Sequence, residues 1–252
     1  MKSIAFLLLK GGIGKTTSAV NFAYLLGEKK HKRVLLVDLD QQGNTTQLFG
    51  CNESEYDLSD LLTNSDIDVH DAIQDTKYPS IKVIGSDAAL IKANQDILID
   101  TENPQQERLS YHLDKIKDEF DYCIFDCPTA TTMSTMNALM YADDVLCPIK
   151  IDRYAFDAVI QSIQLINDMK EYNPKLNYVG AFVTMYQNTA LCNSGIAELE
   201  NNPTVNLFKT KIRCTTKAGE STFYAPLCDY APRATATEDY IKLVNEYLRR
   251  SK

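Results

Sequence analysis

The chain has 252 residues, of which 44% are hydrophobic and 24% are charged, and its formal net charge is −8. This length suits one large α/β domain or two small ones, and because the chain shows no composition break, linker or internal repeat, we expect a single domain over residues 1–252. The acidic balance excludes a protein that binds nucleic acid through its overall charge. Any such role must depend on a local basic patch.

The cysteine pattern and the N-terminal segment both indicate a cytoplasmic protein. The seven cysteines include no CxxC pair, and most lie in apolar runs, which favours buried reduced thiols over a zinc site or a disulfide framework. The apolar run 4–9 is too short for the core of a secretion signal. No segment approaches the ~18 apolar residues of a membrane-spanning helix, so we expect no membrane.

Short apolar runs alternate with helical patterns along the whole chain. Nearly continuous apolar runs are typical of parallel strands covered on both faces, and three- and four-residue apolar steps predict helices at 105–118, 156–169 and 236–250. The polar stretch 51–76 predicts short surface helices. Together these patterns predict an α/β fold, a doubly wound and mostly parallel β-sheet with helices on both faces. The predicted strands are 4–9, 33–38, 82–84, 122–126, 144–149, 178–184 and 207–212.

Residues 10–17, KGGIGKTT, stand between an apolar run and a helical stretch, the setting that a phosphate-binding loop requires. Glycines allow backbone N–H groups to turn inward, and the start of the following helix adds positive charge. Lys15 is expected on the β- and γ-phosphates, Thr16 on Mg²⁺ and Thr17 on the α-phosphate. The predicted nucleotide-binding residues of this loop are Gly11, Gly12, Ile13, Gly14, Lys15, Thr16 and Thr17.

The loop departs from the usual G-x-x-x-x-G-K-[ST] pattern in a specific way. Leu9 occupies the first glycine position, and a second lysine, Lys10, follows it. KGGxGKTT resembles the deviant Walker A loop of the ParA/MinD family of ATPases. This resemblance implies that Lys10 crosses a dimer interface and contacts the nucleotide of the partner. The alternative is an ordinary solvated loop lysine.

Three carboxylates follow predicted strands. Asp38 and Asp40 alternate at a strand end, so they share one face of the sheet, and Asp126 ends the strand in EFDYCIFDCPTATT. The first pair resembles the D-x-D-P-Q-G-N switch of the family, with Gln41 in place of proline. Asp126 resembles its Walker B aspartate. The resemblance implies that Asp40 orients the attacking water and that Asp38 and Asp126 support Mg²⁺. Taken singly, each could simply cap a turn.

The final third of the chain is similar to the same family, although more loosely. By position, the resemblance implies that Ile212 and Arg213 border the adenine. Residues 203–217 contain four basic residues and no acidic one: Lys209, Lys211, Arg213 and Lys217. This run is either a DNA-contacting surface or the solvated edge of a strand, and both remain open.

The sequence therefore predicts a ParA-type ATPase that uses ATP and Mg²⁺, with Lys10, Lys15 and Asp40 as catalytic residues. The resemblance implies an ATP-dependent homodimer, nonspecific binding to double-stranded DNA, a ParB-like adaptor that stimulates hydrolysis, and association with the nucleoid if DNA binds. The alternative is a membrane-cycling or protein-positioning ATPase of the MinD type. His31, His70 and His112 have no assigned chemistry and are expected at the surface.

Overall fold

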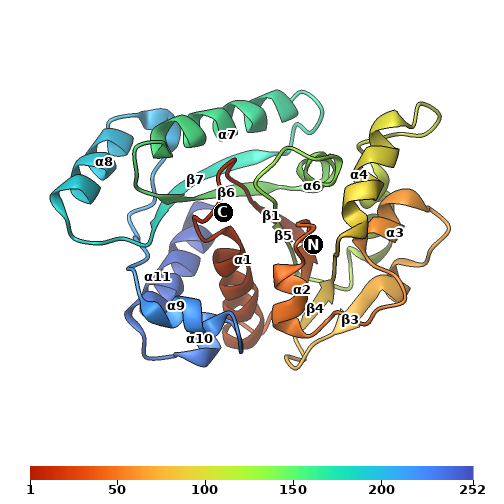
Figure 1. Ribbon diagram of the computed structural model, residues 1–252, viewed down its shortest axis with the longest axis horizontal. Helices are drawn as coiled ribbons and strands as arrows, with labels where there is room; N and C mark the ends of the chain where they lie inside the picture. The colour runs from red at the N-terminus through yellow and green to blue at the C-terminus, as the bar shows by residue number, and fades with distance from the viewer. Residues whose placement is uncertain (252) are drawn as a thin grey trace.

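The computed structural model describes residues 1–251 and contains one seven-stranded sheet with the order β3-β4-β2-β5-β1-β6-β7 (Figure 1). Neighbouring strands pair in parallel except β3 and β4, which are antiparallel. This is the predicted fold class. The strands are β1 Lys2–Phe6, β2 Val34–Asp38, β3 Ile73–Asp75, β4 Ile81–Ile84, β5 Tyr122–Asp126, β6 Asp144–Lys150 and β7 Asn177–Thr184.

Helices cover both faces of the sheet, with α6 and α7 on one side and α1 and α11 on the other (Figure 1). Helix α1 continues as a π-helical turn at Leu25–Lys29, and 3₁₀ turns occupy Val69–Ala72, Asp114–Ile116 and Pro203–Val205. The α-helices are α1 Lys15–Tyr24, α2 Asn44–Phe49, α3 Leu58–Thr63, α4 Ala89–Ile99, α5 Arg108–Leu113, α6 Met133–Tyr141, α7 Ala155–Met169, α8 Ala190–Glu200, α9 Thr216–Ser221, α10 Leu227–Tyr230 and α11 Thr235–Arg250. Within residues 1–251, no helix is long and apolar enough to span a bilayer.

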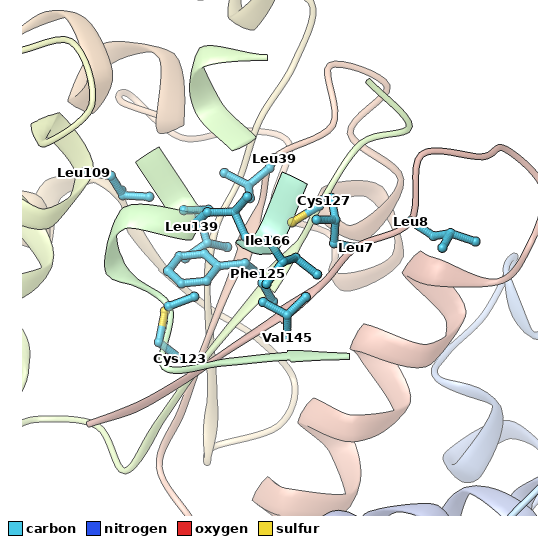
Figure 2. Close-up of a cluster of buried hydrophobic side chains, with 14 of the residues drawn as sticks. Leu7, Leu8, Leu39, Leu109, Cys123, Phe125, Cys127, Leu139, Val145 and Ile166 are labelled. Atoms are coloured by element: carbon cyan, nitrogen blue, oxygen red, sulfur yellow. The ribbon is translucent and has the colours of Figure 1, made fainter. Parts of the chain in front are cut away.

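Alternation along the strands creates two separate hydrophobic cores. In β2, Leu35 and Val37 face one core while Val34 and Leu36 face the other, because successive strand side chains point to opposite faces. Figure 2 shows part of the first core, where Phe125 of β5 lies among side chains of α5, α6 and α7. All of these strand residues are fully buried, which explains the continuous apolar runs in the sequence.

The seventh predicted strand, 207–212, is wrong. The segment runs beside β7, since Phe208 N–H donates to the Ala181 carbonyl at 2.7 Å and Ile212 N–H to the Val183 carbonyl at 2.7 Å. Between these bonds, the Glu246 carboxylate accepts the N–H groups of Lys209 and Thr210 at 2.9 and 3.0 Å. A carboxylate from α11 therefore takes the donors that a regular ladder would use.

Smaller differences concern the other predictions. The three-residue strand β3 was not predicted, and the helix expected at 105–118 is shorter, with α5 at Arg108–Leu113 followed by a 3₁₀ turn. The stretch 51–76 does contain a short helix, α3, but the leucines of that helix are buried. The prediction that His112 lies at the surface is wrong, because its side chain is only 1% exposed and burial lowers its pKa. The single-domain expectation stays a prediction.

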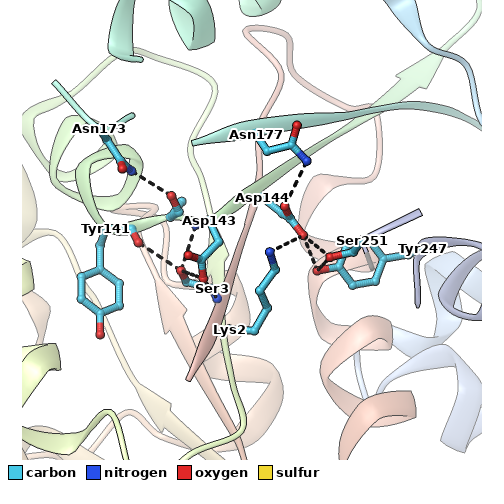
Figure 3. A network of polar contacts seen from close by, with 10 residues as sticks. Lys2, Ser3, Tyr141, Asp143, Asp144, Asn173, Asn177, Tyr247 and Ser251 are labelled. Atoms are coloured by element: carbon cyan, nitrogen blue, oxygen red, sulfur yellow. Dashed lines mark hydrogen bonds and ion pairs between the residues drawn. The ribbon is translucent and has the colours of Figure 1, made fainter. Parts of the chain in front are cut away.

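A polar network at the strand ends opposite the phosphate loop ties the C-terminal helix to the sheet (Figure 3). The buried Asp144 carboxylate accepts hydrogen bonds from the Tyr247 hydroxyl at 2.8 Å and the Ser251 hydroxyl at 2.6 Å, and it pairs with Lys2 at 3.0 Å. Asn177 donates to its other oxygen at 3.3 Å. These bonds compensate for the desolvation of the carboxylate and hold α11 in place.

We expect Tyr247→Phe to lower the free energy of unfolding by about 1.5 kcal/mol, because it removes a hydrogen bond to a buried charge and leaves the ring packing intact. Denaturant unfolding at pH 7 measures this change. Tyr172→Phe is the matched control, since Tyr172 is 62% exposed, and it should change stability by less than about 0.5 kcal/mol. Equal stability of the two variants would contradict the proposed strength of this network.

Candidate nucleotide-binding site

The loop between β1 and α1 has the backbone geometry of a phosphate cradle. Gly14 stands immediately before α1 with φ 83°, and Gly12 has φ 67°, conformations that favour glycine. The first N–H groups of α1 lack intrahelical partners and point toward the loop. The predicted loop residues Gly11 to Thr17 are thus brought together around one helix start.

Lys15 is a buried cation at the base of this loop. Its side chain is almost fully enclosed, and its Nζ donates to the Lys10 carbonyl at 2.9 Å. Burial lowers the pKa of Lys15, while the nearby Asp126 and Asp40 carboxylates oppose that effect. A buried ammonium group with so few compensating contacts favours an anionic ligand such as a phosphate.

Asp38 and Asp126 form a pair of adjacent buried carboxylates. They are direct register partners on β2 and β5, and each is at most 1% exposed. Burial raises the pKa of both groups; the charge of Asp38 adds to this effect at Asp126 and the charge of Asp40 adds to it at Asp38, whereas hydrogen bonds lower both pKa values. Thr45 Oγ1 donates to Asp126 Oδ2 at 2.8 Å, and Thr46 donates to Asp38 Oδ2 through both N–H and hydroxyl, at 2.9 and 2.8 Å.

One oxygen of this pair lacks a partner. Asp126 Oδ1 is buried and accepts no hydrogen bond from any residue in the described range 1–251. This oxygen lies beside a second carboxylate and near the Thr16 hydroxyl. Mg²⁺ prefers oxygen ligands and usually keeps several bound waters, which could donate hydrogen bonds to such a carboxylate. The predicted residues Thr16, Asp38 and Asp126 therefore fit a magnesium site by their chemistry.

Asp40 lies two residues beyond Asp38 in a tightly bonded turn. Its N–H donates to Asp38 Oδ1 at 3.1 Å, and its carboxylate accepts the N–H of Gln42 at 3.0 Å. The side chain is half-buried at the same strand ends as the phosphate loop. This position suits a carboxylate that acts on a water molecule near a bound phosphate.

Lys10 forms an ion pair with Asp152 of the same chain. Asp152 precedes α7, and its carboxylate also accepts the N–H of Tyr154 at 3.0 Å. Burial alone would raise the pKa of Asp152, but Lys10 and the Tyr154 N–H outweigh it and hold the pKa below its usual value. The ion pair is partly exposed, so a stronger anion can displace Asp152.

The two residues predicted beside the adenine lie in different environments. Ile212 is buried and, with Gly14 and Thr17, lines a small cavity of about 170 Å³ on the helix side of the loop. The Arg213 guanidinium turns toward α11, where it donates to Asp239 at 2.7 and 2.8 Å. The cavity suits a flat apolar group, and Arg213 contributes its wall rather than a free charge.

The predicted basic run is split by its local partners. Arg213 is neutralised by Asp239, and Lys217 forms an ion pair with Glu220 at 2.6 Å. Lys209 is exposed, and the Lys211 Nζ lies over the Tyr186 ring, 5.5 Å from its centre. The two lysines are consequently the members of the run whose charges remain available to a phosphate backbone.

Sequence reasoning missed several residues that shape this site. Thr45 and Thr46 directly follow the switch motif in the sequence, so their hydroxyls could have been predicted as hydrogen-bond donors to the carboxylates. Asp152 and Ser86 are far from every motif in the chain, and only the fold brings them to Lys10 and to the Asp40 loop. Their contributions depend on strand order, which no local pattern encodes.

A strand, a glycine-rich loop, a helix start with a buried lysine, and paired carboxylates on neighbouring strands together define a P-loop nucleotide-binding protein. Residues 1–178 match the family model described as an AAA domain. The chain is 32% identical to the sporulation initiation inhibitor protein Soj of Bacillus subtilis, covering 97% of each chain. It is 29% identical to the chromosome partitioning protein ParA of Myxococcus xanthus, covering 96% of this chain and 86% of that protein.

Among solved structures, cobyrinic acid a,c-diamide synthase from Mycobacterium smegmatis with a bound ATP analog and magnesium has the same fold. Its TM-score is 0.85 at 24% identity, and the match covers 99% of this chain and 95% of that one. The chain thus belongs to the ParA/MinD family of P-loop ATPases.

We expect Asp126→Asn to raise the stability of the nucleotide-free protein at pH 8 by about 2 kcal/mol, because it removes one of two adjacent buried charges. Burial raises the pKa of Asp38 to about 6 and that of Asp126 to about 7. A raised carboxyl pKa means that the folded protein binds the extra proton, so wild-type stability falls as pH rises from about 4 through 7. The gain from Asp126→Asn should therefore shrink at pH 5, as thermal unfolding at both pH values measures.

Asp121→Asn is the control of opposite sign, because Arg33 holds the pKa of Asp121 below its usual value. This variant should lose stability at pH 8 and approach wild type in acid. A destabilised Asp126→Asn protein at pH 8 would contradict the repulsion between the paired carboxylates.

Proposed function

We propose that this protein is a magnesium-dependent ATPase of the ParA type, which dimerises with ATP and partitions DNA. The observation that carries the proposal is Lys10, a second lysine held beside the phosphate loop by an ion pair that a phosphate can replace. The cofactors are ATP and Mg²⁺, as in the synthase complex with its ATP analog and magnesium.

In this proposal each residue of the site has one task. Lys15 and the loop N–H groups bind the phosphates, and the buried cavity beside Ile212 receives the adenine. Thr16, Asp38 and Asp126 hold the metal, which neutralises charge on the phosphates when bound. Asp40 aligns and activates the attacking water. Phosphoryl transfer needs positioning and charge neutralisation more than covalent chemistry, so no nucleophilic side chain is required.

Lys10 links hydrolysis to the number of subunits. Within one chain its ammonium group is held by Asp152, near the start of α7. In the proposed dimer Lys10 exchanges Asp152 for the phosphates of the partner's nucleotide. ATP then acts as a dimerisation ligand, and hydrolysis ends the dimer.

DNA is the proposed partner of the ATP-bound dimer, and a ParB-like adaptor is proposed to stimulate hydrolysis. The support is the relationship to a chromosome partitioning protein, together with the free charges of Lys209 and Lys211. Each lysine occurs twice in a dimer, which doubles the phosphate contacts. Such binding would place the protein on the nucleoid. A membrane-cycling ATPase of the MinD type would need an amphipathic helix whose apolar face is available to the membrane. The apolar residues Tyr240, Leu243 and Tyr247 of α11 instead pack into the core, so α11 does not support this alternative.

We expect Lys10→Ala to abolish ATP-dependent dimerisation, and Asp152→Ala to leave it intact or strengthen it, because the second change releases Lys10. Light scattering with ATP, in an Asp40→Ala background that blocks hydrolysis, measures the dimer. Lys92→Ala is the control, since Lys92 forms a similar exposed ion pair on α4. If Lys10→Ala dimerises normally in the Asp40→Ala background, and the Lys10→Ala single variant hydrolyses ATP like the wild-type protein, the proposed role of this lysine is wrong.

For DNA, we expect binding of nonspecific duplex only with ATP, and a linear fall of log affinity with log salt. Lys209→Ala and Lys211→Ala should each reduce the salt slope by about 2, because each removes one phosphate contact per subunit. Fluorescence anisotropy in ATP, ADP and no nucleotide checks this, with Lys175→Ala as the control. Binding to anionic liposomes instead of DNA would favour the MinD-type alternative.

A further inference from the structure

The turn after β4 places a buried hydroxyl against the Asp40 loop. Strand β4 lies next to β2 in the sheet, so the residues that follow β4 meet the residues that follow Asp38. Ser86 stands at this point and is only 3% exposed. Its Oγ donates to the Asp40 carbonyl at 2.6 Å, and its N–H donates to Thr46 Oγ1 at 2.9 Å.

Through these contacts the peptide groups on both sides of Asp40 are fixed. The Asp40 N–H donates to Asp38 at 3.1 Å, and the Asp40 carbonyl accepts both Ser86 Oγ and the Gly43 N–H, the latter at 2.9 Å. A peptide held at both ends leaves its side chain few directions. Ser86 is the only one of these donors that lies outside the Asp38–Gly43 segment.

Close packing reinforces this junction. A Cβ at Gly43, where φ is +60°, would lie 2.7 Å from the Ser86 carbonyl oxygen. A Cβ at Gly85 would lie 2.8 Å from Thr46 Cγ2. The two loops therefore approach at backbone contact distance, and the Ser86 hydroxyl sits where a small shift of either loop would break its bond.

We propose that Ser86 is a positioning residue for ATP hydrolysis: it holds the Asp40 peptide so that the Asp40 carboxylate is directed at the attacking water. This inference rests on the proposed role of Asp40. Within residues 1–251, the Ser86 hydroxyl donates its hydrogen bond to the Asp40 carbonyl and forms none with the phosphate loop or the paired carboxylates, and the Thr46 bond uses the backbone N–H of Ser86. The side chain therefore acts on the hydrolytic step and leaves nucleotide binding to other residues.

Ser86→Ala tests the proposal, because it removes the hydroxyl and leaves the bond to Thr46. We expect kcat to fall on the order of tenfold, the effect of one hydrogen bond, while KM and the affinity for a fluorescent ATP analogue remain unchanged. In the Asp40→Ala background, Ser86→Ala should cause no further loss of the residual rate of hydrolysis, measured at high enzyme concentration, because the two residues act through one carboxylate. Ser3→Ala is the control: Ser3 is equally buried and bonded at the opposite strand ends, and its loss should affect stability alone.

The outcomes separate this inference from the proposed function. If Asp40→Ala hydrolyses ATP normally, the assignment of Asp40 fails. If Asp40→Ala is inactive while Ser86→Ala keeps the wild-type kcat, only the role of Ser86 fails. A loss of nucleotide affinity in Ser86→Ala, or an equal kcat loss with and without Asp40, would also overturn it, since either result indicates general disruption of the fold.

Discussion

Repulsion between two buried carboxylates is the constraint on which the site depends. Asp38 and Asp126 are register partners on adjacent parallel strands, so the sheet itself forces them together at the strand ends that face the phosphate loop. Burial raises the pKa of both carboxyl groups, and the neighbouring Asp38 charge raises that of Asp126 further. The hydroxyls of Thr45 and Thr46 and the nearby charge of Lys15 partly compensate for this unfavourable pair. A divalent cation relieves the same repulsion, which makes metal binding favourable.

The pair also organises the loop that carries Asp40. Because Thr45 and Thr46 are consecutive, their bonds to the two carboxylates anchor the start of α2 to both strands. The loop between Asp38 and α2 is therefore fixed at both ends, by β2 on one side and by the anchored start of α2 on the other, and Asp40 lies within it. Ser86, in the turn after β4, adds a hydrogen bond to the Asp40 carbonyl. The geometry of Asp40 thus depends on β2, β4 and β5 together, so the carboxylate proposed to activate water is positioned by the sheet rather than by a free loop.

The parts of this structure that were predictable are those with local causes. Burial on both faces of the sheet produces continuous apolar runs, and a phosphate loop needs glycine at positions of positive φ, so the sheet and the loop could both be predicted from the sequence. The failures have distant causes. Glu246 accepts the backbone N–H of Thr210 from 36 residues away, and His112 is buried on α5, which packs against α3. The partner of Lys10 lies 142 residues along the chain. These contacts follow from the order of strands, which periodicity does not reveal.

The strength of the Lys10–Asp152 contact determines how Lys10 can serve in a switch. A partly exposed ion pair contributes about 0–1 kcal/mol, because water and salt screen it and two side chains must be ordered. Nucleotide phosphates carry more charge than one carboxylate, and a subunit interface would exclude water from the contact, so in the proposed dimer the exchange of Asp152 for a partner's phosphates is favourable. When the terminal phosphate leaves after hydrolysis, part of that advantage disappears while Asp152 remains available in the same chain. The weak internal pair therefore makes the lysine both easily recruited and easily returned, as a reversible dimer requires.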